Sequence, residues 1–460
     1  MQRRTANAVS ARLLCVLVTL CLASSAATAQ TDLTALFATP TQAELDAVTA
    51  DWASRDVTPS QYTVERTAAG GGFDLAEVSH ELGGLTHYGV IRYPRHHQPG
   101  GKFPVLVMLH GGFDGLDLDQ VLTFDEDYPA GCVADSFLVV APVYRGEMLN
   151  GYGILPTRWS DGDPSPFDFD CDDTIALLSA VLANEPTADS SRVTALGGSR
   201  GGNVAYHLAM RDPRIRRTVV RYGPSEFRMA HVQTGAQEMA DTGATDDRLG
   251  ELVYEHIAGP YLSGAITLTK ARHMLCSWNV VPYLDGDLSL QVHHGAQDDI
   301  VPVAHSLVVD AVMTMKGADA PEYDYFEYPS GSHNPYSLTG HEPVTEDYLC
   351  ATPAATGVSG LAPAPLRLNA APNPFTGTVE LSASVTAGAT KLLAATAELL
   401  IFDARGRHVR TLALEARSAE RSAVSWDGRD AAGRETPAGV YFAAPAGRPV
   451  AAPLRITRLR

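Results

Sequence analysis

The sequence predicts an α/β domain with a mostly parallel sheet, followed by a small all-β sandwich. Short apolar runs recur through the first part, among them PVLVML (104–109), FLVVAPV (137–143) and LSLQVHH (288–294). Helical patterns such as DDTIALLSAVLANE (172–185) separate them. Strands that are apolar throughout and alternate with helices indicate a parallel sheet covered on both faces.

The second part of the chain has no strong helical pattern. Segments rich in β-branched and aromatic residues, such as VELSASV and GVYFAA, alternate with turns expected at Gly406, Gly428 and Gly433. This pattern is typical of a β-sandwich.

The net charge divides the chain at the same place. Residues 30–350 contain 19 Lys and Arg against 45 Asp and Glu, whereas residues 366–460 contain 13 against 8. Between them, residues 351–365 are uncharged and rich in Ala, Pro, Gly and Thr, which is linker composition. We therefore expect two domains of opposite charge. The overall charge of −18 argues against a nucleic-acid partner.

The first 29 residues have the features of a secretory signal peptide. Arg3, Arg4 and Arg12 precede or open a short apolar run, and Ala27-Thr28-Ala29 forms a small-residue cleavage site. This pattern predicts cleavage after Ala29 and a secreted or cell-surface location.

Residues 30–85 are expected to form an N-terminal helix and the first strands. Thr41 and Glu44 are spaced as a capping box for a helix over 41–55. Two strand patterns flank Gly83-Gly84 and predict a hairpin. Further along, residues 224–287 interrupt the strand-helix rhythm and are expected to form an inserted cap.

Four cysteines remain after the predicted signal: Cys132, Cys171, Cys276 and Cys350. An even number in an exported protein favours disulfides, and four cysteines allow three connectivities, between which the sequence does not choose. No CxxC pair occurs, so we expect no zinc site. We also expect that the protein needs no metal or organic cofactor.

The stretch LGGSRGGNV (196–204) carries the main chemical signal. A strand pattern precedes Gly197-Gly198-Ser199-Arg200-Gly201 and a helical pattern follows it. A G-x-S-x-G sequence between a strand and a helix is the context of a nucleophile elbow, in which a tight turn presents a serine above the sheet. Ser199 is therefore the candidate nucleophile, and the simple alternative is a flexible glycine loop.

A serine nucleophile needs a base and an acid, and in folds that have a nucleophile elbow both residues follow the serine along the chain. Asp298 lies just past the strand LSLQVHH, and His333 follows the strand YDYFEYP. We expect His333 to accept the serine proton and Asp298 to orient its imidazole. Asp299 remains an alternative acid.

Other histidines compete for these roles. His305 is expected to open a helix and His341 lies beyond the loop, whereas His293 and His294 are expected to support the acid loop.

An oxyanion hole needs two donors. The backbone N–H of Arg200, at the start of the helix, is the first candidate. The strand PVLVML ends in His110-Gly111-Gly112, where such folds supply the second donor, usually a backbone N–H. Gly111 and His110 are the candidates there, and an ordinary glycine turn is the alternative.

The acidic run SDGDPSPFDFDCDD (160–173) contains many oxygen ligands and could suggest calcium. It lacks the EF-hand spacing and contains two prolines. We expect a solvated loop that leads into a helix N-terminus, where Asp172 and Asp173 complement the helix dipole.

With these motifs assembled, residues 86–350 resemble an α/β-hydrolase, and within that fold the prolyl oligopeptidase catalytic domain. The matching stretches are FPVLVMLHGG, VYRGEMLNGYG, GGSRGG, HHGAQDDIVPVAHS and YPSGSHN. The resemblance implies Ser199 as nucleophile, Asp298 as acid, in preference to Asp299, and His333 as base, with the N–H of Arg200 as oxyanion donor.

The resemblance is incomplete in two places. His110 stands where some members of the family have an oxyanion tyrosine. In addition, only about 55 residues separate the predicted signal from the hydrolase domain, little more than one ~40–45-residue propeller blade. The family's β-propeller is therefore not expected, and peptide specificity does not follow from the resemblance.

The C-terminal part resembles the Ig-like domain of flagellar hook-capping proteins and of type IX secretion cargo. NAAPNPFTG (369–377), AELLIFDARGRHVRTL (397–412), SWDGRDAAGRETPAGVYFA (425–443) and the basic end ITRLR follow that pattern in order. The resemblance implies secretion or surface attachment.

The sequence thus predicts a secreted serine hydrolase that cleaves an ester or amide bond through an acyl-enzyme. The first hypothesis is a prolyl-oligopeptidase-like serine peptidase, and the alternative is a carboxylesterase or dienelactone-hydrolase-like esterase. A non-catalytic surface binding protein is a further alternative, although all three triad positions are filled.

Overall fold

The computed structural model describes residues 32–95, 97, 100–318, 322–351, 367–384, 398–403, 408–418, 421–445 and 454–459. The predicted signal peptide with its cleavage site at Ala29, almost all of the predicted linker and the predicted turn at Gly406 lie outside these residues. In the part of the chain that is described, no helix is long and apolar enough to cross a membrane.

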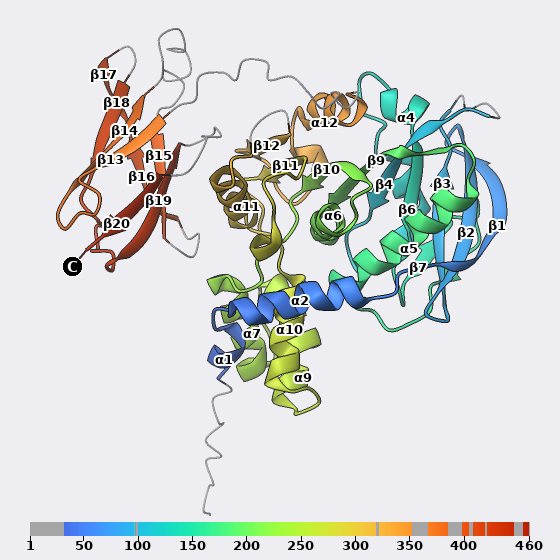
Figure 1. Ribbon diagram of the computed structural model, residues 1–460, viewed down its shortest axis with the longest axis horizontal. Coiled ribbons are helices and arrows are strands. Elements are labelled where there is room, and N and C mark those ends of the chain that lie inside the picture. Colours follow the sequence, from blue (N-terminus) through green and yellow to red (C-terminus); the bar gives the residue numbers. More distant parts are fainter. Residues whose placement is uncertain are drawn as a thin grey trace, which may run out of the picture.

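A nine-stranded sheet forms the centre of the first domain (Figure 1). Its order is β1-β2-β3-β6-β4-β9-β10-β11-β12. The pairings up to β3–β6 are antiparallel, and those from β6 onward are parallel. The strands are β1 (Ser60–Gly70), β2 (Phe73–Leu82), β3 (Leu85–Arg92), β4 (Phe103–Leu109), β6 (Leu138–Pro142), β9 (Ala188–Gly198), β10 (Ile215–Arg221), β11 (Leu290–Gly295) and β12 (Tyr323–Tyr328). The predicted α/β class is confirmed.

The sheet begins earlier in the sequence than the expected domain start at residue 86. The predicted hairpin around Gly83-Gly84 is present as β2 and β3, and β1 extends it. Because β1 and β2 pair in sequence with β3 of the nine-stranded sheet, with β1 at its edge, residues 60–85 are part of the α/β domain and not a separate leading segment.

Helices cover both faces of the sheet, as the apolar strands require. In β4, Val105 and Val107 face one buried cluster, and Leu106 and Met108 face the other. The first face is covered by α5 (Asp168–Asn184), α6 (Arg200–Arg211) and α11 (Ala304–Met315). The second is covered by α3 (Leu118–Thr123), α4 (Cys132–Ser136) and α12 (His341–Cys350).

A disulfide between Cys132 and Cys350 joins α4 to α12. The other two cysteines, Cys171 and Cys276, are free and buried. Each of the three connectivities that the sequence allowed contains two disulfides. The structure has the Cys132–Cys350 bond of one of them, whereas the second pair of that connectivity, Cys171 and Cys276, is not bonded.

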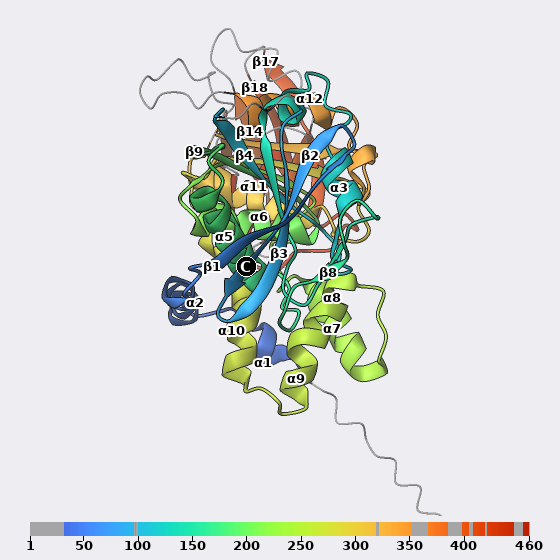
Figure 2. The same cartoon turned by 90° about the vertical axis from the view of Figure 1, so that its right-hand side faces the viewer.

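Residues 224–287 form a mainly helical cap at one end of the sheet (Figure 2). Its elements are α7 (Ala230–Thr242), α8 (Arg248–Val253), a π-helical turn (Tyr254–Ala258), α9 (Gly259–Leu262), α10 (Leu268–Trp278) and a 3-10 turn (Val281–Tyr283). The N-terminal helices α1 (Thr34–Phe37) and α2 (Gln42–Ser54) pack against α10. Thr41 and Glu44 form the expected capping box, and Glu44 also binds Arg272 of α10.

Short elements complete the first domain. A 3-10 turn spans Pro335–Ser337, and a three-stranded sheet contains β5 (Leu116–Asp117), β7 (Met148–Asn150) and β8 (Arg158–Trp159).

The C-terminal domain contains two four-stranded sheets, β13-β14-β18-β17 and β16-β15-β19-β20. All of their pairings are antiparallel, and Trp426 and Phe375 lie in the buried core between them. The strands are β13 (Arg367–Ala371), β14 (Val379–Ser384), β15 (Glu398–Asp403), β16 (His408–Ala413), β17 (Glu415–Ser418), β18 (Arg421–Trp426), β19 (Gly439–Pro445) and β20 (Leu454–Arg458).

Candidate active site

Ser199 occupies the sharp turn between β9 and α6. Its backbone has φ 55° and ψ −125°, a conformation that non-glycine residues seldom adopt. The glycines around it are required by space. A Cβ on Gly197 would lie 2.1 Å from the carbonyl oxygen of Gly201, and one on Gly201 would lie 2.1 Å from that of Leu109. The glycine-rich stretch is therefore a constrained turn and not a flexible loop.

The structure brings Ser199, His333 and Asp298 into one hydrogen-bonded line. Nε2 of His333 lies 2.9 Å from Oγ of Ser199. Nδ1 of the same ring lies 2.8 Å from Oδ2 of Asp298. These distances allow proton transfer from the serine hydroxyl to the imidazole and orientation of the imidazole by the carboxylate. The three residues follow the carboxyl ends of β9, β12 and β11, where a parallel sheet places its sites.

Asp298 is fixed by its surroundings, whereas Asp299 is exposed. Oδ1 of Asp298 accepts hydrogen bonds from the backbone N–H groups of Ile300 and Val301, at 3.0 and 2.8 Å. Burial would raise the pKa of Asp298, but hydrogen bonds from His294 and His333 outweigh it and hold that pKa well below its usual range. A permanently ionised carboxylate is the form that stabilises an imidazolium.

The other histidines that the sequence singled out have structural contacts. His294 supports the acid loop through the Val301 carbonyl oxygen, 2.7 Å from its Nε2. His305 lies in the first turn of α11, where its Nδ1 accepts from the backbone N–H of Ser225 at 3.1 Å. His293 contacts Tyr328, and His341 begins α12.

Tyr222, which sequence reasoning missed, packs behind the base. Its ring lies 4.5 Å from the His333 ring, centre to centre. The same ring closes over the elbow, since a Cβ on Gly198 would lie 3.3 Å from it. The only signal in the sequence is its position directly after the strand β10.

Two backbone segments meet beside Ser199 where an oxyanion would form. Arg200 is the first residue of α6, so its N–H has no acceptor within the helix. The loop after β4 runs past the serine: a Cβ on Gly111 would lie 3.2 Å from Cβ of Ser199. Both segments thus lie beside Ser199, and the roles of Arg200 and Gly111 as oxyanion donors stay predictions.

The side chain of His110 is oriented away from such a role. Its ring stacks on Tyr144, with centres 4.2 Å apart, and its Nδ1 lies 3.1 Å from the carbonyl oxygen of Gly111. Nε2 is buried, 3.7 Å from Oε2 of Glu147. Burial and the nearby Arg200 cation lower the pKa of His110 to about 3, so the ring is neutral. The described contacts of the two ring nitrogens are thus with Gly111 and Glu147, and they give no support to the side chain of His110 as an oxyanion donor.

The guanidinium of Arg200 holds the loop after β4 against the elbow. Its Nη1 donates to the carbonyl oxygen of Gly112 at 3.0 Å and to Oε1 of Glu147. Its Nε and Nη2 donate to Asp170 at 2.7 and 2.9 Å. Burial raises the pKa of Glu147 to about 7 despite this contact. The sequence indicated only the backbone of Arg200; the role of its side chain depends on partners 30 and 53 residues away.

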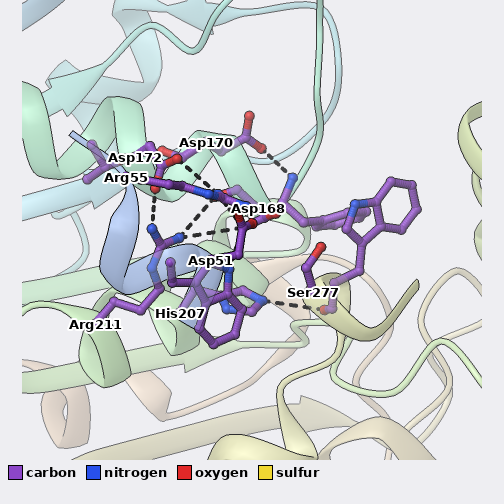
Figure 3. A network of polar contacts seen from close by, with 12 residues as sticks. Asp51, Arg55, Asp168, Asp170, Asp172, His207, Arg211 and Ser277 are labelled. Atoms are coloured by element: carbon purple, nitrogen blue, oxygen red, sulfur yellow. Dashed lines mark hydrogen bonds and ion pairs between the residues drawn. The ribbon is translucent and has the colours of Figure 1, made fainter. Parts of the chain in front are cut away.

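The acidic run is the expected exposed loop only over residues 161–164, and from residue 166 onward it is mostly buried. The helix α5 begins at Asp168, one turn earlier than the pattern suggested, and Asp168, Asp170, Asp172 and Asp173 are all buried. Asp168 and Asp172 bind Arg55 and Arg211 (Figure 3), and Asp173 binds Arg145. The carboxylates are buried because four arginines from other segments neutralise them, which the local sequence does not reveal.

A pocket of about 710 Å³ opens at Ser199. The cap contributes Arg248, Leu249 and Leu252 to one side, and α3 and α12 contribute Gln120 and Glu342 to the other. Among the described residues, no group of three or more His, Cys, Asp and Glu is arranged to hold a metal ion.

The strand order and the elbow define the first domain as an α/β-hydrolase. Comparison with known proteins agrees with the presence of two domains. Residues 373–444 match the FlgD Ig-like domain, which confirms the resemblance of the C-terminal part.

The first domain is similar to fungal proteins described as probable dipeptidyl-aminopeptidase B. The protein from Aspergillus oryzae is 25% identical over 271 residues, which are 56% of this chain and 26% of that protein. The one from Emericella nidulans is 26% identical over 275 residues, 58% of this chain and 26% of that protein. The chain therefore spans about a quarter of the length of the curated relatives it matches.

Solved structures with a similar arrangement include acetyl xylan esterase 1 from Thermoanaerobacterium, with a TM-score of 0.43 and 17% identity over 67% of this chain and 92% of that one. Another is the Pyrococcus horikoshii acylaminoacyl peptidase, with a TM-score of 0.40 and 18% identity over 59% of this chain and 39% of that one. TM-scores this low carry no argument about the fold, so the fold is assigned from the strand order of the sheet.

Proposed function

We propose that this chain is a serine hydrolase that cleaves an ester or amide bond through an acyl-enzyme. The observation that carries the proposal is the line from Ser199 through His333 to Asp298, with hydrogen-bond distances of 2.9 and 2.8 Å. The strained elbow supports it, because a fold retains such a conformation where it presents a reactive group.

In the first half of the reaction, Oγ of Ser199 attacks the substrate carbonyl carbon while Nε2 of His333 takes the hydroxyl proton. The N–H of Arg200 and an N–H of the loop at Gly111 stabilise the resulting oxyanion. The intermediate then expels the alcohol or amine, which receives the proton from His333, and leaves an acyl group on Ser199.

In the second half, His333 removes a proton from water, and the oxygen of that water attacks the acyl carbon. Collapse of this second intermediate releases the acid and returns the proton to Ser199. In each half, Asp298 keeps Nδ1 of the neutral His333 ring protonated, so that Nε2 can accept a proton, and it then stabilises the imidazolium that forms.

Within this class, we propose a prolyl-oligopeptidase-like serine peptidase as the first candidate. The curated relatives support it, since both are described as probable dipeptidyl-aminopeptidases. A carboxylesterase is the second candidate, because the triad itself serves esters and amides equally and the 710 Å³ pocket has apolar walls at Phe113, Leu249 and Leu252.

We further propose that the protein is exported. The signal-peptide pattern of residues 1–29 supports export, and the match of residues 373–444 to an FlgD Ig-like domain supports contact with a secretion apparatus or the cell surface. A mature protein that begins at Gln30, read from its N-terminal peptide by mass spectrometry, is the expected result; a retained Met1–Ala29 segment would contradict export by this route.

The proposed chemistry predicts that Ser199→Ala loses at least about 10³-fold in kcat/KM while it remains folded. The test uses a panel of 4-nitrophenyl esters and of prolyl and aminoacyl amides, together with labelling by a fluorophosphonate. The control is Ser191→Ala, an exposed serine at the other end of β9, which should keep turnover and labelling. Turnover or labelling that persists in Ser199→Ala contradicts the proposal. Cleavage of esters with no cleavage of any amide selects the esterase.

A further inference from the structure

Arg221 lies next to the nucleophile on the neighbouring strand. It is the last residue of β10, and the parallel register pairs it with Gly198 of β9. Its carbonyl oxygen accepts the backbone N–H of Ser199 at 3.0 Å. The position of Arg221 is therefore as rigid as that of the elbow, and its side chain lines the same pocket.

The guanidinium of Arg221 is buried without a counter-charge. The residue is 6% exposed, and the side-chain partner given by the structure is the hydroxyl of Tyr128, to which Nη2 donates. Its Nε is buried and has no hydrogen-bond partner among the described residues. Within the same residues, Arg221 forms no ion pair with a carboxylate.

Other buried arginines of the described chain differ in this respect. Arg92 binds Asp125 at 2.9 Å, and Arg200 binds Asp170 and Glu147. Burial of an unpaired cation costs several kcal/mol, so buried charges in proteins are normally paired. An unpaired arginine in the lining of a pocket has donors available for a group that the protein itself does not supply.

The acidic groups near Arg221 are already engaged or lie in solvent. Glu346 accepts the backbone N–H groups of Ala130 and Cys132 at 2.7 and 2.6 Å. Asp125 is bound by Arg92. Of the acidic residues that line the pocket, Asp114, Asp119 and Asp127 are exposed and Asp117 and Glu342 are half-buried, so water screens their charges more than that of Arg221.

The neighbouring histidines do not compensate the charge either. Burial, together with the Arg221 cation, lowers the pKa of His293 well below its usual range and that of His341 to about 4. Both rings are neutral near pH 7. Arg221 is therefore a charged group in the pocket lining that is buried and has no bound anion among the described residues.

We propose that Arg221 binds a carboxylate of the substrate, so that the preferred substrates are esters or amides with a free carboxylate in the part that lies between α3 and α12. This inference depends on the proposed hydrolase function and adds the substrate class. A carboxylate suits the site because its two oxygens accept the parallel N–H groups of a guanidinium.

The test compares two pairs of substrates that differ only in charge. For a carboxylate on the leaving group, the pair is 4-acetoxybenzoate and 4-acetoxybenzamide. For a carboxylate on the acyl group, it is mono-4-nitrophenyl adipate and 4-nitrophenyl adipamate. We expect the wild type to prefer the carboxylate by about 10- to 100-fold in kcat/KM in at least one pair, the range expected for a charge-assisted hydrogen bond.

The variants assign that preference to Arg221. Arg221→Met should reduce it to about parity with little change for the neutral substrate, and Arg221→Lys should retain part of it. The matched control is Arg248→Met, which removes an arginine of the same pocket that has a carboxylate partner, Glu251, and should leave the preference unchanged. No preference in either pair, a preference that persists in Arg221→Met, or one that is lost in Arg248→Met would overturn the inference.

Binding separates this inference from the proposed function. In Ser199→Ala, titration calorimetry should show tighter binding of 4-acetoxybenzoate or of adipate monoester than of the matching amide, and Arg221→Met in that background should abolish the difference. If the wild type cleaves no ester or amide but this difference is present, only the proposed function fails. If neutral esters are cleaved through Ser199 and neither rate nor binding favours the carboxylate, only the Arg221 assignment fails.

Discussion

Two arginines ten residues apart, Arg211 and Arg221, have mostly buried side chains but opposite surroundings. Arg211 ends α6 and lies among Asp168 and Asp172, which also bind Arg55, the residue that follows the N-terminal helix α2 (Figure 3). Arg221 ends β10 and contacts the hydroxyl of a tyrosine. The first arginine joins three segments of the scaffold, whereas the second faces a pocket.

The difference shows how one chain uses buried charge in two ways. Where carboxylates surround the cation, removal of either partner leaves an uncompensated buried ion, so the contact is needed for stability. Where the buried cation has no carboxylate partner, removal of the arginine relieves a desolvation cost. The presence of an arginine at such a position therefore indicates a ligand. Substitution of Arg211 should therefore change mainly the stability of the protein, whereas substitution of Arg221 should change mainly its activity.

The largest effect is expected at the acid of the proposed triad. Asp298→Asn should lower kcat/KM by about 10⁴-fold, because the amide donates to Nδ1 of His333 and selects the tautomer that cannot accept the serine proton. Stability should change far less than activity, since Oδ1 still accepts the backbone N–H groups of Ile300 and Val301. The control is Asp299→Asn at the exposed neighbour; an equal loss in that variant would contradict the assignment.

The scaffold arginine should show the reverse. Arg211→Met leaves Asp168 and Asp172 with one cation fewer in a buried environment, and we expect it to lower the free energy of unfolding by about 3–5 kcal/mol. Urea denaturation followed by circular dichroism measures this. Arg434→Met, at a side chain that is 79% exposed, provides the control and should stay within about 0.5 kcal/mol of the wild type.

The pocket arginine tests the comparison directly. Arg221→Met should leave the free energy of unfolding within about 1 kcal/mol of the wild type or raise it, because an unpaired buried cation is replaced by an apolar side chain of similar length. The same denaturation experiment applies. A loss as large as that of Arg211→Met would mean that Arg221 is a scaffold residue, and the contrast between the two would disappear.

The smallest effect is expected at the partly exposed contact between α2 and the cap. A hydrogen bond from Arg272 lowers the pKa of Glu44 to about 2. Because the folded pKa is below the unfolded value of about 4.5, this contribution is present above pH 4.5 and is lost as the pH falls toward 2. Glu44→Gln should cost at most about 1 kcal/mol at pH 7, and nothing at pH 2. A deficit that is constant with pH would show that the charge is not involved.

Local sequence patterns predicted the parts of the site that lie at strand ends. Ser199, Asp298 and His333 each follow a predicted strand, and parallel strands end at the same edge, so their order along the chain was enough to expect them together. The capping box at Thr41 and the hairpin around Gly83-Gly84 were visible for the same reason, since both depend on residues close in sequence.

Features that depend on distant partners were not visible. The orientation of His110 is set by Tyr144 and Glu147, and the run at 168–173 is buried because arginines from three other segments reach it. The pairing of Cys132 with Cys350 across 218 residues follows from the packing of α4 beside α12.

The sequence by itself determined the α/β-hydrolase fold, the Ig-like domain and the candidate triad, because hydrophobic periodicity and tight turns act over a few residues. Only the tertiary structure decided which buried charges are paired. Pairing depends on which side chains the folded chain brings within a few ångströms. Arg211 lies beside two carboxylates, whereas Arg221 lies beside a tyrosine hydroxyl.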